Sequence, residues 1–382
     1  MISPRVAFIC RGYPGLGKVM GAVALEAMLR ESTPGLESLF LSYERGVAYL
    51  RNAGANVIDL FEGLPPLAPN AFCTPFGPET ARAMTALAAF APTLVVNDGE
   101  PYLVELTSEL LGVPTVVLAH PLDLHNPGNA PLAVSLFRHF YARAHCVIAH
   151  GIERLPHGTT MLGGRAGRVL EVNTLVRPAV LRAKNHSGGL ALTAVLGGGS
   201  QNTSDHFRAG TLQLGTWVLR ASAALGLSSA KLFVSDPSLA AELPAPGPGV
   251  TIVPDASDNA TDLAGADVVV GRAGRNLVSE FVALKKRGVV VPINGTAFRT
   301  SGQEAAAEEA VRANPNLRVA RLSDGYDAFE QALRELQSQA VKPVSWEPGN
   351  EAAASVLRRL LRFPETALAE GLDDPSRREP IP

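Results

Sequence analysis

Short apolar runs alternate with helix-length segments along most of this chain, and the alternation begins twice. The first series opens with an apolar run at 6–10 and a glycine turn, and it ends with a run at 146–149. The second opens in the same way, with a run at 190–196 and a glycine turn, and includes later runs at 267–270 and 289–292. Alternation of strands and helices is typical of parallel, doubly wound sheets. The sequence therefore predicts an α/β fold built from two Rossmann-like domains.

The polar, glycine-containing segment at 182–189 lies between the two series and is the expected linker. With 382 residues the chain is too long for one ordinary domain, and its 46% hydrophobic residues give each half enough apolar side chains for a core. We therefore expect a first domain over 1–182 and a second over 190–348. An amphipathic helix is expected within 349–364, followed by a polar, proline-rich tail over 365–382.

Overall composition excludes several classes of protein. Only 18% of the residues are charged and the net charge is -2, so the chain lacks the basic character of a nucleic-acid binder. The three cysteines are far apart and odd in number, and they form neither a disulfide framework nor a metal-binding spacing. No apolar run reaches the roughly 18 residues needed to span a bilayer, and the first strand begins too early to leave room for a signal peptide. We expect a cytoplasmic protein with no nucleic-acid partner.

The segment 271–280, which reads GRAGRNLVSE, carries the clearest functional signal. It follows an apolar run at 266–270 and precedes a helical pattern at 277–284. A glycine turn between a parallel strand and a helix directs free backbone N–H groups toward a site where anions bind. Arg272 would neutralise a diphosphate there. Glu280, about one turn into the helix, would accept hydrogen bonds from ribose hydroxyls.

A second glycine turn, at 197–201, opens the same half of the chain. Ser200 and Gln201 stand where a helix begins, so their N–H groups and the serine hydroxyl would bind a phosphate; the alternative is that Ser200 is only the N-cap of that helix. Gln303 and Glu304 begin a later helix, and their amide and carboxylate suit sugar hydroxyls. Two glycine turns in one half indicate a nucleotide held across the carboxyl edge of a parallel sheet.

The first half has a glycine turn of its own at 12–19, which reads G-x-x-x-x-G-K and is one residue short of a P-loop. Val19 stands where a P-loop has the serine or threonine that holds magnesium. Three interpretations stay open. The turn is an ATP-binding loop in which Lys18 contacts phosphate, a helix-capping loop without a ligand, or a loop whose glycines Gly15 and Gly17 let an acceptor approach the backbone.

Polar side chains follow two later apolar runs of the first half, at the strand ends where ligands of open parallel sheets bind. Asp98 ends the first of these runs, shortly before Glu100, and is either a general base or the cap of a helix expected at 102–111. The second run leads into three further candidates, His120, Asp123 and His125. Without a helical H-x-x-x-H spacing these three are a weak metal signal, so substrate hydrogen bonding or proton transfer is favoured over a metal site. Four other histidines are expected to be structural or at the surface: His139, His145, His150 and His157.

Taken together, these motifs resemble the C-terminal half of GT-B glycosyltransferases. The matching order is GGSQ, then ADVVVGRAG and SE, then VPI and GQE, over about residues 190–312. The family that it most resembles is the peptidoglycan N-acetylglucosaminyltransferase-like family, of glycosyltransferase family 28 type. The first half agrees more loosely, through the glycine loop at 12–17 and the DGEP turn at 98–101.

The resemblance implies two domains around a central cleft, with a nucleoside-diphosphate sugar on the second domain and the acceptor on the first. The helix within 349–364 would cross back to the first domain. The implied donor-binding residues are Gly199, Ser200, Gln201, Asp255, Arg272, Gly274, Glu280, Gln303 and Glu304. The acceptor-side candidates are Gly15, Gly17, Glu100 and His125, and the catalytic candidates are Lys18, Asp98, His120 and Asp123.

Two positions depart from the pattern of that family. The histidine usual at the end of the first glycine loop is Lys18 here, and an ordinary lysine is charged near pH 7, where a neutral imidazole acts as a base. Lys18 would then bind the diphosphate or an anionic acceptor, and the base would be Asp98, His120 or Asp123. The usual Glu-Gln pair of the sugar motif reads Gln-Glu at 303–304, which leaves the donor sugar open.

The expected activity is an inverting transfer of a hexose or amino-hexose, without metal or cofactor, from a sugar nucleotide that the resemblance makes UDP-linked. The acceptor would be a hydroxyl of a small-molecule or lipid-linked compound in secondary metabolism or cell-envelope biosynthesis, and a lipid-linked acceptor would bring peripheral membrane contact. The alternatives are a nucleotide-sugar hydrolase or epimerase on the same fold, a catalytically silent nucleotide-sugar sensor, and an ATP-binding protein that uses the loop at 12–19.

Overall fold

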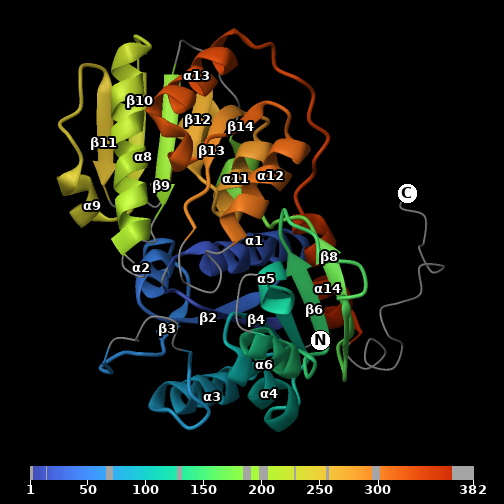
Figure 1. Ribbon diagram of the computed structural model, residues 1–382. Helices are drawn as coiled ribbons and strands as arrows, with labels where there is room; N and C mark the ends of the chain where they lie inside the picture. The colour runs from blue at the N-terminus through green and yellow to red at the C-terminus, as the bar shows by residue number, and fades with distance from the viewer. Residues whose placement is uncertain are drawn as a thin grey trace.

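The computed structural model contains two parallel sheets, one in each half of the chain, with helices on both faces of each (Figure 1). The predicted α/β fold of two doubly wound sheets is thereby confirmed. The structure describes residues 3–13, 15–65, 72–126, 131–183, 191–197, 205–227, 229–254, 258–294 and 302–363.

The first sheet has eight strands, in the order β3 (Val57–Asp59), β2 (Glu37–Ser42), β1 (Arg5–Cys10), β4 (Leu94–Asp98), β5 (Thr115–Ala119), β6 (Cys146–His150), β8 (Gly167–Val172) and β7 (Met161–Gly163). Neighbouring strands are parallel except for β7, which pairs antiparallel with β8. The chain runs from β1 toward one edge and returns at β4 toward the other, so the topological switch point lies between β1 and β4.

The second sheet has six parallel strands, in the order β11 (Val250–Pro254), β10 (Ser229–Val234), β9 (Ala191–Gly197), β12 (Val268–Arg272), β13 (Arg287–Val291) and β14 (Leu317–Val319). Its switch point lies between β9 and β12. Ligands of open parallel sheets bind at the carboxyl ends of the strands beside such a point.

Helices connect the strands in both halves. In the first half they are α1 (Gly17–Ser32), α2 (Arg45–Asn52), α3 (Pro78–Phe90), α4 (Pro101–Glu105), η1 (Leu106–Leu110), α5 (Pro121–Leu124), α6 (Pro131–Tyr141) and α7 (Pro178–Arg182). In the second half they are α8 (Asp205–Ala224), α9 (Pro237–Glu242), α10 (Ala260–Gly265), α11 (Arg275–Ala283), α12 (Gln303–Ala313), η4 (Leu322–Asp324), α13 (Gly325–Ser338) and α14 (Asn350–Arg362).

Strand β1 shows how the sequence fixes the two layers of the first half. Successive side chains of a strand point to opposite faces of the sheet. Val6, Phe8 and Cys10 therefore enter the core on one face, while Ala7 and Ile9 enter the core on the other. A strand that is apolar at every position is what a sheet covered by helices on both faces requires.

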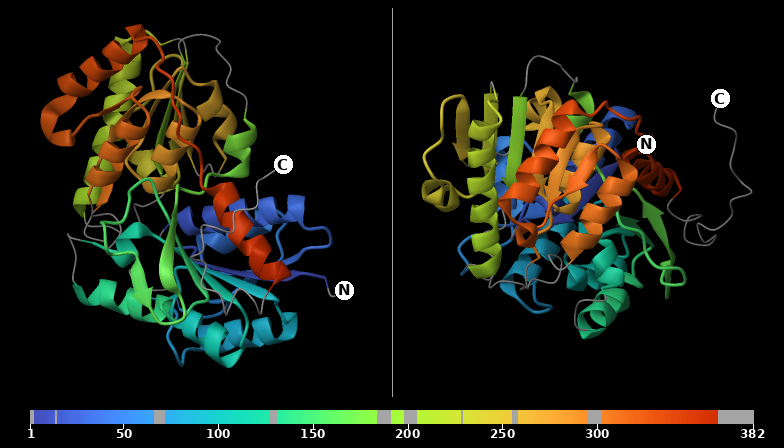
Figure 2. Two further views of the ribbon diagram at one scale, coloured as in Figure 1. Left: turned by 90° about the vertical axis from the view of Figure 1, so that its right-hand side faces the viewer. Right: turned by 45° about the horizontal axis from the view of Figure 1, so that its top comes forward.

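Helix α14 follows the second sheet in the chain but packs on the first half. Leu357 and Leu360 of α14 lie in the same apolar core as Val19 and Leu25 of α1. Figure 2 shows the red α14 beside the blue N-terminal elements, away from the helices of the second sheet. Because these side chains are at most 2% exposed, α14 is a structural part of the first half's core.

The helix expected at 102–111 is not a single α-helix. The α-helical part ends at Glu105, and the next turn, Leu106–Leu110, is π-helical. The hydroxyls of Thr107 and Ser108 donate hydrogen bonds of 2.8 Å to the carbonyl oxygens of Leu103 and Val104, one turn earlier. Such side-chain bonds compete with the backbone pattern of a regular helix.

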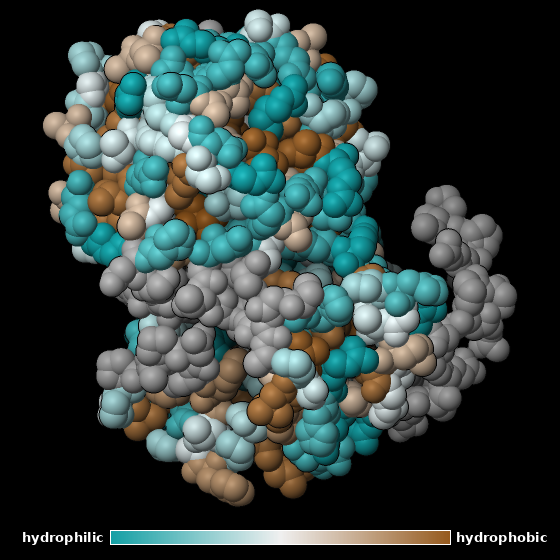
Figure 3. Space-filling view, in the orientation of Figure 1, coloured by the Kyte–Doolittle hydropathy of each residue, from teal (hydrophilic) through white to brown (hydrophobic). Residues whose placement is uncertain are grey.

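The surface of the described residues carries scattered apolar side chains among hydrophilic ones. Figure 3 shows this mixture on one face, with apolar areas in both halves. Exposed large apolar residues of the first half include Phe76, Leu110, Leu132 and Leu136. Within the described part of the chain, no helix combines the length and apolar character needed to cross a bilayer.

Candidate functional site

A buried ion pair occupies the switch point of the first sheet. Lys18 is the second residue of α1, Asp98 is the last residue of β4, and the lysine Nζ contacts Asp98 Oδ1. The two side chains are 10% and 1% exposed. Gly99, with φ +107°, lets the lysine lie flat on the turn, since a Cβ there would come within 2.6 Å of the lysine Cδ. Two of the predicted catalytic residues are therefore brought together.

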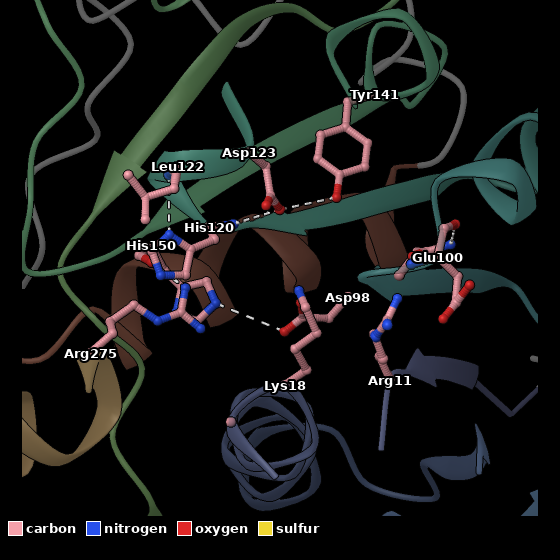
Figure 4. A network of polar contacts seen from close by, with 12 residues as sticks. Arg11, Lys18, Asp98, Glu100, His120, Leu122, Asp123, Tyr141, His150 and Arg275 are labelled. Carbon is pink, nitrogen blue, oxygen red and sulfur yellow. Dashed lines mark hydrogen bonds and ion pairs between the residues drawn. The ribbon is translucent and has the colours of Figure 1, made fainter. Parts of the chain in front are cut away.

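His150 and Arg275 extend this pair toward the second half of the chain (Figure 4). His150 is the last residue of β6, and its Nε2 lies 3.9 Å from Asp98 Oδ2. Arg275, the first residue of α11, donates a 2.9 Å hydrogen bond to the His150 carbonyl oxygen. We expected His150 to be structural or at the surface, and it is fully buried beside a predicted catalytic residue. Its position at a strand end, at the same sheet edge as Asp98, is the signal that could have identified it.

Charge and burial set the protonation of these groups. Burial by itself would raise the pKa of Asp98, but the Lys18 ammonium, His150 and the Arg275 charge together hold it well below its usual range. Burial and, less strongly, the Arg275 charge lower the pKa of His150 to about 4, although Asp98 opposes the shift. The site at neutral pH therefore contains an ionised Asp98 and a neutral His150.

The depressed pKa of His150 predicts a pH-dependent stability. An unfolded histidine binds a proton near pH 6.5, whereas His150 in the folded protein does so only near pH 4. Between these values the unfolded state holds the extra proton, so the free energy of unfolding should fall by about 3 kcal/mol as pH drops from 6.5 to 4. Urea unfolding from pH 4.5 to 7.5 measures this slope.

His150→Gln is the matched variant for that measurement, because it keeps a polar side chain but does not titrate. This variant should lose the part of the pH dependence that His150 causes. The part caused by His145 should remain, because burial also lowers the pKa of His145 to about 4. An unchanged slope in His150→Gln would show that His150 does not cause the pH dependence.

His120 and Asp123 form the N-terminal cap of α5. His120 Nδ1 accepts a hydrogen bond from the Leu122 N–H at 3.1 Å, and Asp123 Oδ2 accepts from the His120 N–H at 3.3 Å. Asp123 also accepts from the Tyr141 hydroxyl at 3.2 Å and is fully buried. A neutral His120 with its Nδ1 lone pair so used carries its proton on Nε2, and would face a substrate as a hydrogen-bond donor.

The remaining acceptor-side candidates lie around the same strand ends. Glu100 is fully buried, and its carboxylate accepts hydrogen bonds from the Tyr43 hydroxyl and, at 2.9 Å, from the Cys73 N–H. Gly15 lies in the turn before α1, and His125 is the C-cap of α5. The described part of the chain contains no group of three or more His, Cys, Asp or Glu side chains that could hold a metal ion.

Arg272 occupies the switch point of the second sheet, as the last residue of β12. Its side chain lies over the Phe207 ring, 4.6 Å from the centroid, and Nη1 donates to Thr211 Oγ1 at 3.3 Å. Nε is buried without a partner, and none of the ion pairs of the described residues involves this guanidinium. Burial lowers the pKa of Arg272 to about 10. A buried cation is costly without a counter-ion, and the described residues supply none to Arg272, so an anion bound there would stabilise it.

Glu280 is engaged by an arginine from the end of the first half. Arg177 donates to Glu280 through Nε at 2.6 Å and through Nη2 at 2.8 Å, and Nη2 also lies 2.6 Å from Asn259 Oδ1. Glu280 is 4% exposed. A ribose at this position would have to use the lone pairs that Arg177 leaves, so ribose binding by Glu280 stays a prediction.

The other donor-side candidates are distributed as follows. Gly274 is the N-cap of α11, and a Cβ there would meet nothing within 4 Å. Gln303 accepts a 3.1 Å hydrogen bond from the Ile293 N–H, and Glu304 forms an ion pair with Arg321. Four further candidates lie outside the described residues: Gly199, Ser200, Gln201 and Asp255.

The carboxyl ends of the two sheets face each other, and residues from both halves touch there. Asn276 Nδ2 donates to the Gly17 carbonyl oxygen at 2.9 Å, at the start of α1. A Cβ on Gly302, before α12, would come within 2.6 Å of Leu122 Cδ1 on α5. Because Asn276 follows Arg272 by only four positions, the two switch points lie on opposite sides of one interface.

Comparison with known proteins gives likeness in structure only. No family model and no curated protein matches the sequence. The glycosyltransferase SnogD from Streptomyces nogalater is 18% identical, with a TM-score of 0.55 over 94% of this chain and 100% of that chain. MurG from Acinetobacter baumannii is 16% identical, with a TM-score of 0.54 over 93% of this chain and 99% of that chain.

A third solved structure is the spinosyn rhamnosyltransferase SpnG in complex with spinosyn aglycone. It is 15% identical, with a TM-score of 0.57 over 96% of this chain and 98% of that chain. SpnG is also solved in complex with thymidine diphosphate. These structures are GT-B glycosyltransferases and the likeness runs over nearly the whole chain. The chain therefore has the GT-B fold of glycosyltransferases.

Proposed function

We propose that this protein is a glycosyltransferase that moves a hexose or amino-hexose from a nucleoside-diphosphate sugar to a hydroxyl of a small-molecule or lipid-linked acceptor. The observation that carries the proposal is the buried, uncompensated guanidinium of Arg272 at the switch point of the second sheet. A diphosphate bound there would supply the missing negative charge. The Lys18–Asp98 pair on the facing sheet edge supports an acceptor site opposite the donor.

The donor is proposed to carry a pyrimidine diphosphate, with UDP as the first candidate from the family resemblance. The thymidine diphosphate complex of the similarly folded SpnG supports testing dTDP beside UDP. Arg272 and the helix N-termini after β9 and β12 would neutralise the charge that develops on the leaving diphosphate. This arrangement supports a transfer that does not depend on a metal ion.

The transfer is proposed to be a single displacement. The acceptor hydroxyl gives its proton to a base and its oxygen forms a bond to the anomeric carbon. The bond from that carbon to the diphosphate oxygen breaks on the opposite face, and the electron pair leaves with the nucleoside diphosphate. One displacement of this kind inverts the configuration at the anomeric carbon.

In place of the bases expected from the sequence (Asp98, His120 or Asp123), the proposed base is Lys18, which acts only in the fraction of molecules where it is uncharged, with Asp98 orienting it. The lysine covers the carboxylate: its side chain is 10% exposed, whereas that of Asp98 is 1% exposed. Asp98 Oδ2 faces inward, since a Cβ on Gly21 of α1 would lie 3.6 Å from it. Nζ is therefore the atom of the pair that reaches an acceptor, while His120 offers a hydrogen-bond donor.

Nucleotide binding tests the proposal most directly. Calorimetry without magnesium should detect UDP, dTDP or one of their sugar conjugates, and Arg272→Gln should weaken that binding roughly 30-fold or more because it removes a buried charge from an ion pair. Arg287→Gln is the control. Arg287 is the first residue of β13, so it lies at the amino ends of the strands, whereas Arg272 lies at the carboxyl ends. The control variant should bind nucleotides as the wild type does.

Other outcomes of this experiment assign other functions. Binding of ATP alone, dependent on magnesium, lost in Lys18→Ala and unaffected in Arg272→Gln, would move the site to the loop at 12–19 and overturn the proposal. Release of free sugar at the same rate with and without acceptors would identify a hydrolase. Tight donor binding with no turnover for any acceptor would identify a sensor.

A further inference from the structure

Among the described residues, Arg11 is a second buried arginine without a counter-ion, and it lies in the first half. It follows β1 directly and is 3% exposed. Its Nε donates to the Tyr13 carbonyl oxygen at 2.7 Å, while Nη1 is buried with no hydrogen-bond partner. No carboxylate of the described residues forms an ion pair with it. Burying a guanidinium is costly unless a negative charge or enough hydrogen-bond acceptors surround it.

The neighbouring carboxylate does not fill this role. Glu100 already accepts hydrogen bonds from the Tyr43 hydroxyl and the Cys73 N–H, and neither oxygen bonds to Arg11. The Phe72 ring covers one face of the guanidinium, with its centroid 4.4 Å from Cζ. With Nε bonded and a face covered, the edge formed by Nη1 and Nη2 is the part of Arg11 left to bind a ligand.

Arg11 and Arg272 both lie beside the switch point of their sheet, and their surroundings are similar. Arg11 follows β1 and Arg272 ends β12, and each of these strands borders the switch point of its sheet. Each guanidinium lies over an aromatic ring, that of Phe72 or that of Phe207, and each has a buried nitrogen without a partner. Arg272, at the end of β12, is assigned to the anionic part of the donor; Arg11 follows β1, which borders the switch point of the first sheet from the other side, next to β4.

We infer that the acceptor carries an oxyanion, a carboxylate or a phosphate, and that Arg11 binds it through its Nη1–Nη2 edge. The inference rests on the proposed function and names the chemical class of its acceptor. The Arg11 N–H bonds to the Asp98 carbonyl oxygen at 3.2 Å, so the oxyanion would lie close to the Lys18–Asp98 pair. Figure 4 shows the Lys18 and Arg11 side chains extending in the same direction, toward the end of β4.

The geometry favours a planar or tetrahedral oxyanion over a single acceptor atom. Two N–H groups on one guanidinium edge form parallel hydrogen bonds with two oxygens of a carboxylate or phosphate. Tyr13 and Phe72, which contact Arg11, are only half-buried, whereas Arg11 itself is 3% exposed. A neutral isostere would leave the buried guanidinium unpaired, which is how a polar site rejects an uncharged analogue strongly. The acceptor is thus a hydroxy acid or a phosphorylated alcohol.

Small aromatic probes test this inference without knowledge of the natural acceptor. Benzoate, phenyl phosphate and the neutral benzamide are titrated by calorimetry into wild type, Arg11→Gln and Arg272→Gln, each checked for folding by its thermal transition. We expect at least one of the two anions to bind wild type 10-fold or more tightly than benzamide. That preference should disappear in Arg11→Gln and persist in Arg272→Gln, whereas nucleotide binding should show the reverse dependence. Which anion is preferred distinguishes a carboxylate from a phosphate acceptor.

Even if Arg11→Gln does not fold, the binding of the anions and of benzamide to wild type can be compared. Arg11→Lys then serves as the second variant, because it keeps the charge but loses the paired N–H edge. Arg11→Lys should retain only part of the preference. Equal or undetectable binding of both anions and benzamide to wild type overturns the inference, as does an anion preference that survives in Arg11→Gln. Absence of nucleotide binding to wild type would instead overturn the proposed function. Failure of the inference about Arg11 can therefore be distinguished from failure of the proposed function.

Discussion

Replacing Lys18 with alanine is expected to lower kcat by roughly 10²- to 10⁴-fold, the range typical of losing a positioned general base. Lys18 Nζ contacts Asp98 and reaches the interface between the two sheets, so the variant removes the proposed proton acceptor and leaves the donor site on the second sheet intact. Release of nucleoside diphosphate in the presence of an acceptor measures kcat. Calorimetry with the same nucleotide should give an unchanged Kd.

The pH profile identifies which member of the pair takes the proton. An amine base works only when deprotonated, so the wild-type rate should rise toward the alkaline range, where a free lysine amine titrates at about pH 10.4. Lys18→His should restore activity with its rising limb moved toward about pH 6.5. In the protein that retains Lys18, Asp98→Asn should move the rising limb of the pH–rate profile to lower pH, because the carboxylate that favours the charged amine is gone. Complete inactivity of Asp98→Asn at every pH, with full activity in Lys18→Ala, would make Asp98 the base.

Replacing Arg177 with methionine is expected to destabilise the fold by about 3–5 kcal/mol, the cost of leaving one member of a buried ion pair uncompensated. Arg177 is 9% exposed and Glu280 4% exposed, and the two form a double hydrogen bond of 2.6 and 2.8 Å. Urea unfolding at pH 7 measures the change. A loss below about 1 kcal/mol would show that the pair adds little to stability.

The double variant Arg177→Met with Glu280→Met separates the ion pair from its surroundings. Without either charge, no buried group is left unpaired, so the double variant should be more stable than the sum of the two single variants predicts. Strict additivity would mean that the two side chains do not interact in solution. Nucleotide binding by the double variant would also test whether Glu280 contacts the ribose.

Periodicity predicted the fold well because each strand of these sheets is a local apolar segment. The runs at 6–10 and 267–270 are buried on both faces and can be recognised without knowing their neighbours. The hairpin of β7 and β8 was missed because its burial is interrupted: Met161 is 57% exposed and Leu170 37% exposed. Exposed apolar positions weaken the pattern that identifies a strand.

The site was predicted in part. A motif identifies a residue at a strand end, but it does not identify the side chain from a distant part of the sequence that contacts this residue. Asp98 and Lys18 were both singled out, yet their pairing joins positions 80 residues apart. Arg177 lies 103 residues before Glu280, in a segment with no recognisable motif. Arg11 was overlooked because the glycines after it defined the motif. A basic residue directly after a strand at the switch point, as at Arg272, would have been the signal.

The placement of α14 has a consequence for synthesis on the ribosome. Residues up to Arg182 emerge first, but the apolar side chains of α1 that share a core with Leu357 and Leu360 stay uncovered until α14 has been made. At about 5–20 residues per second, that delay is roughly 10–35 s. The apolar core of the first half therefore stays incomplete during that time, so we expect the synthesis of α14, rather than completion of the first half's own strands, to permit its final folding step.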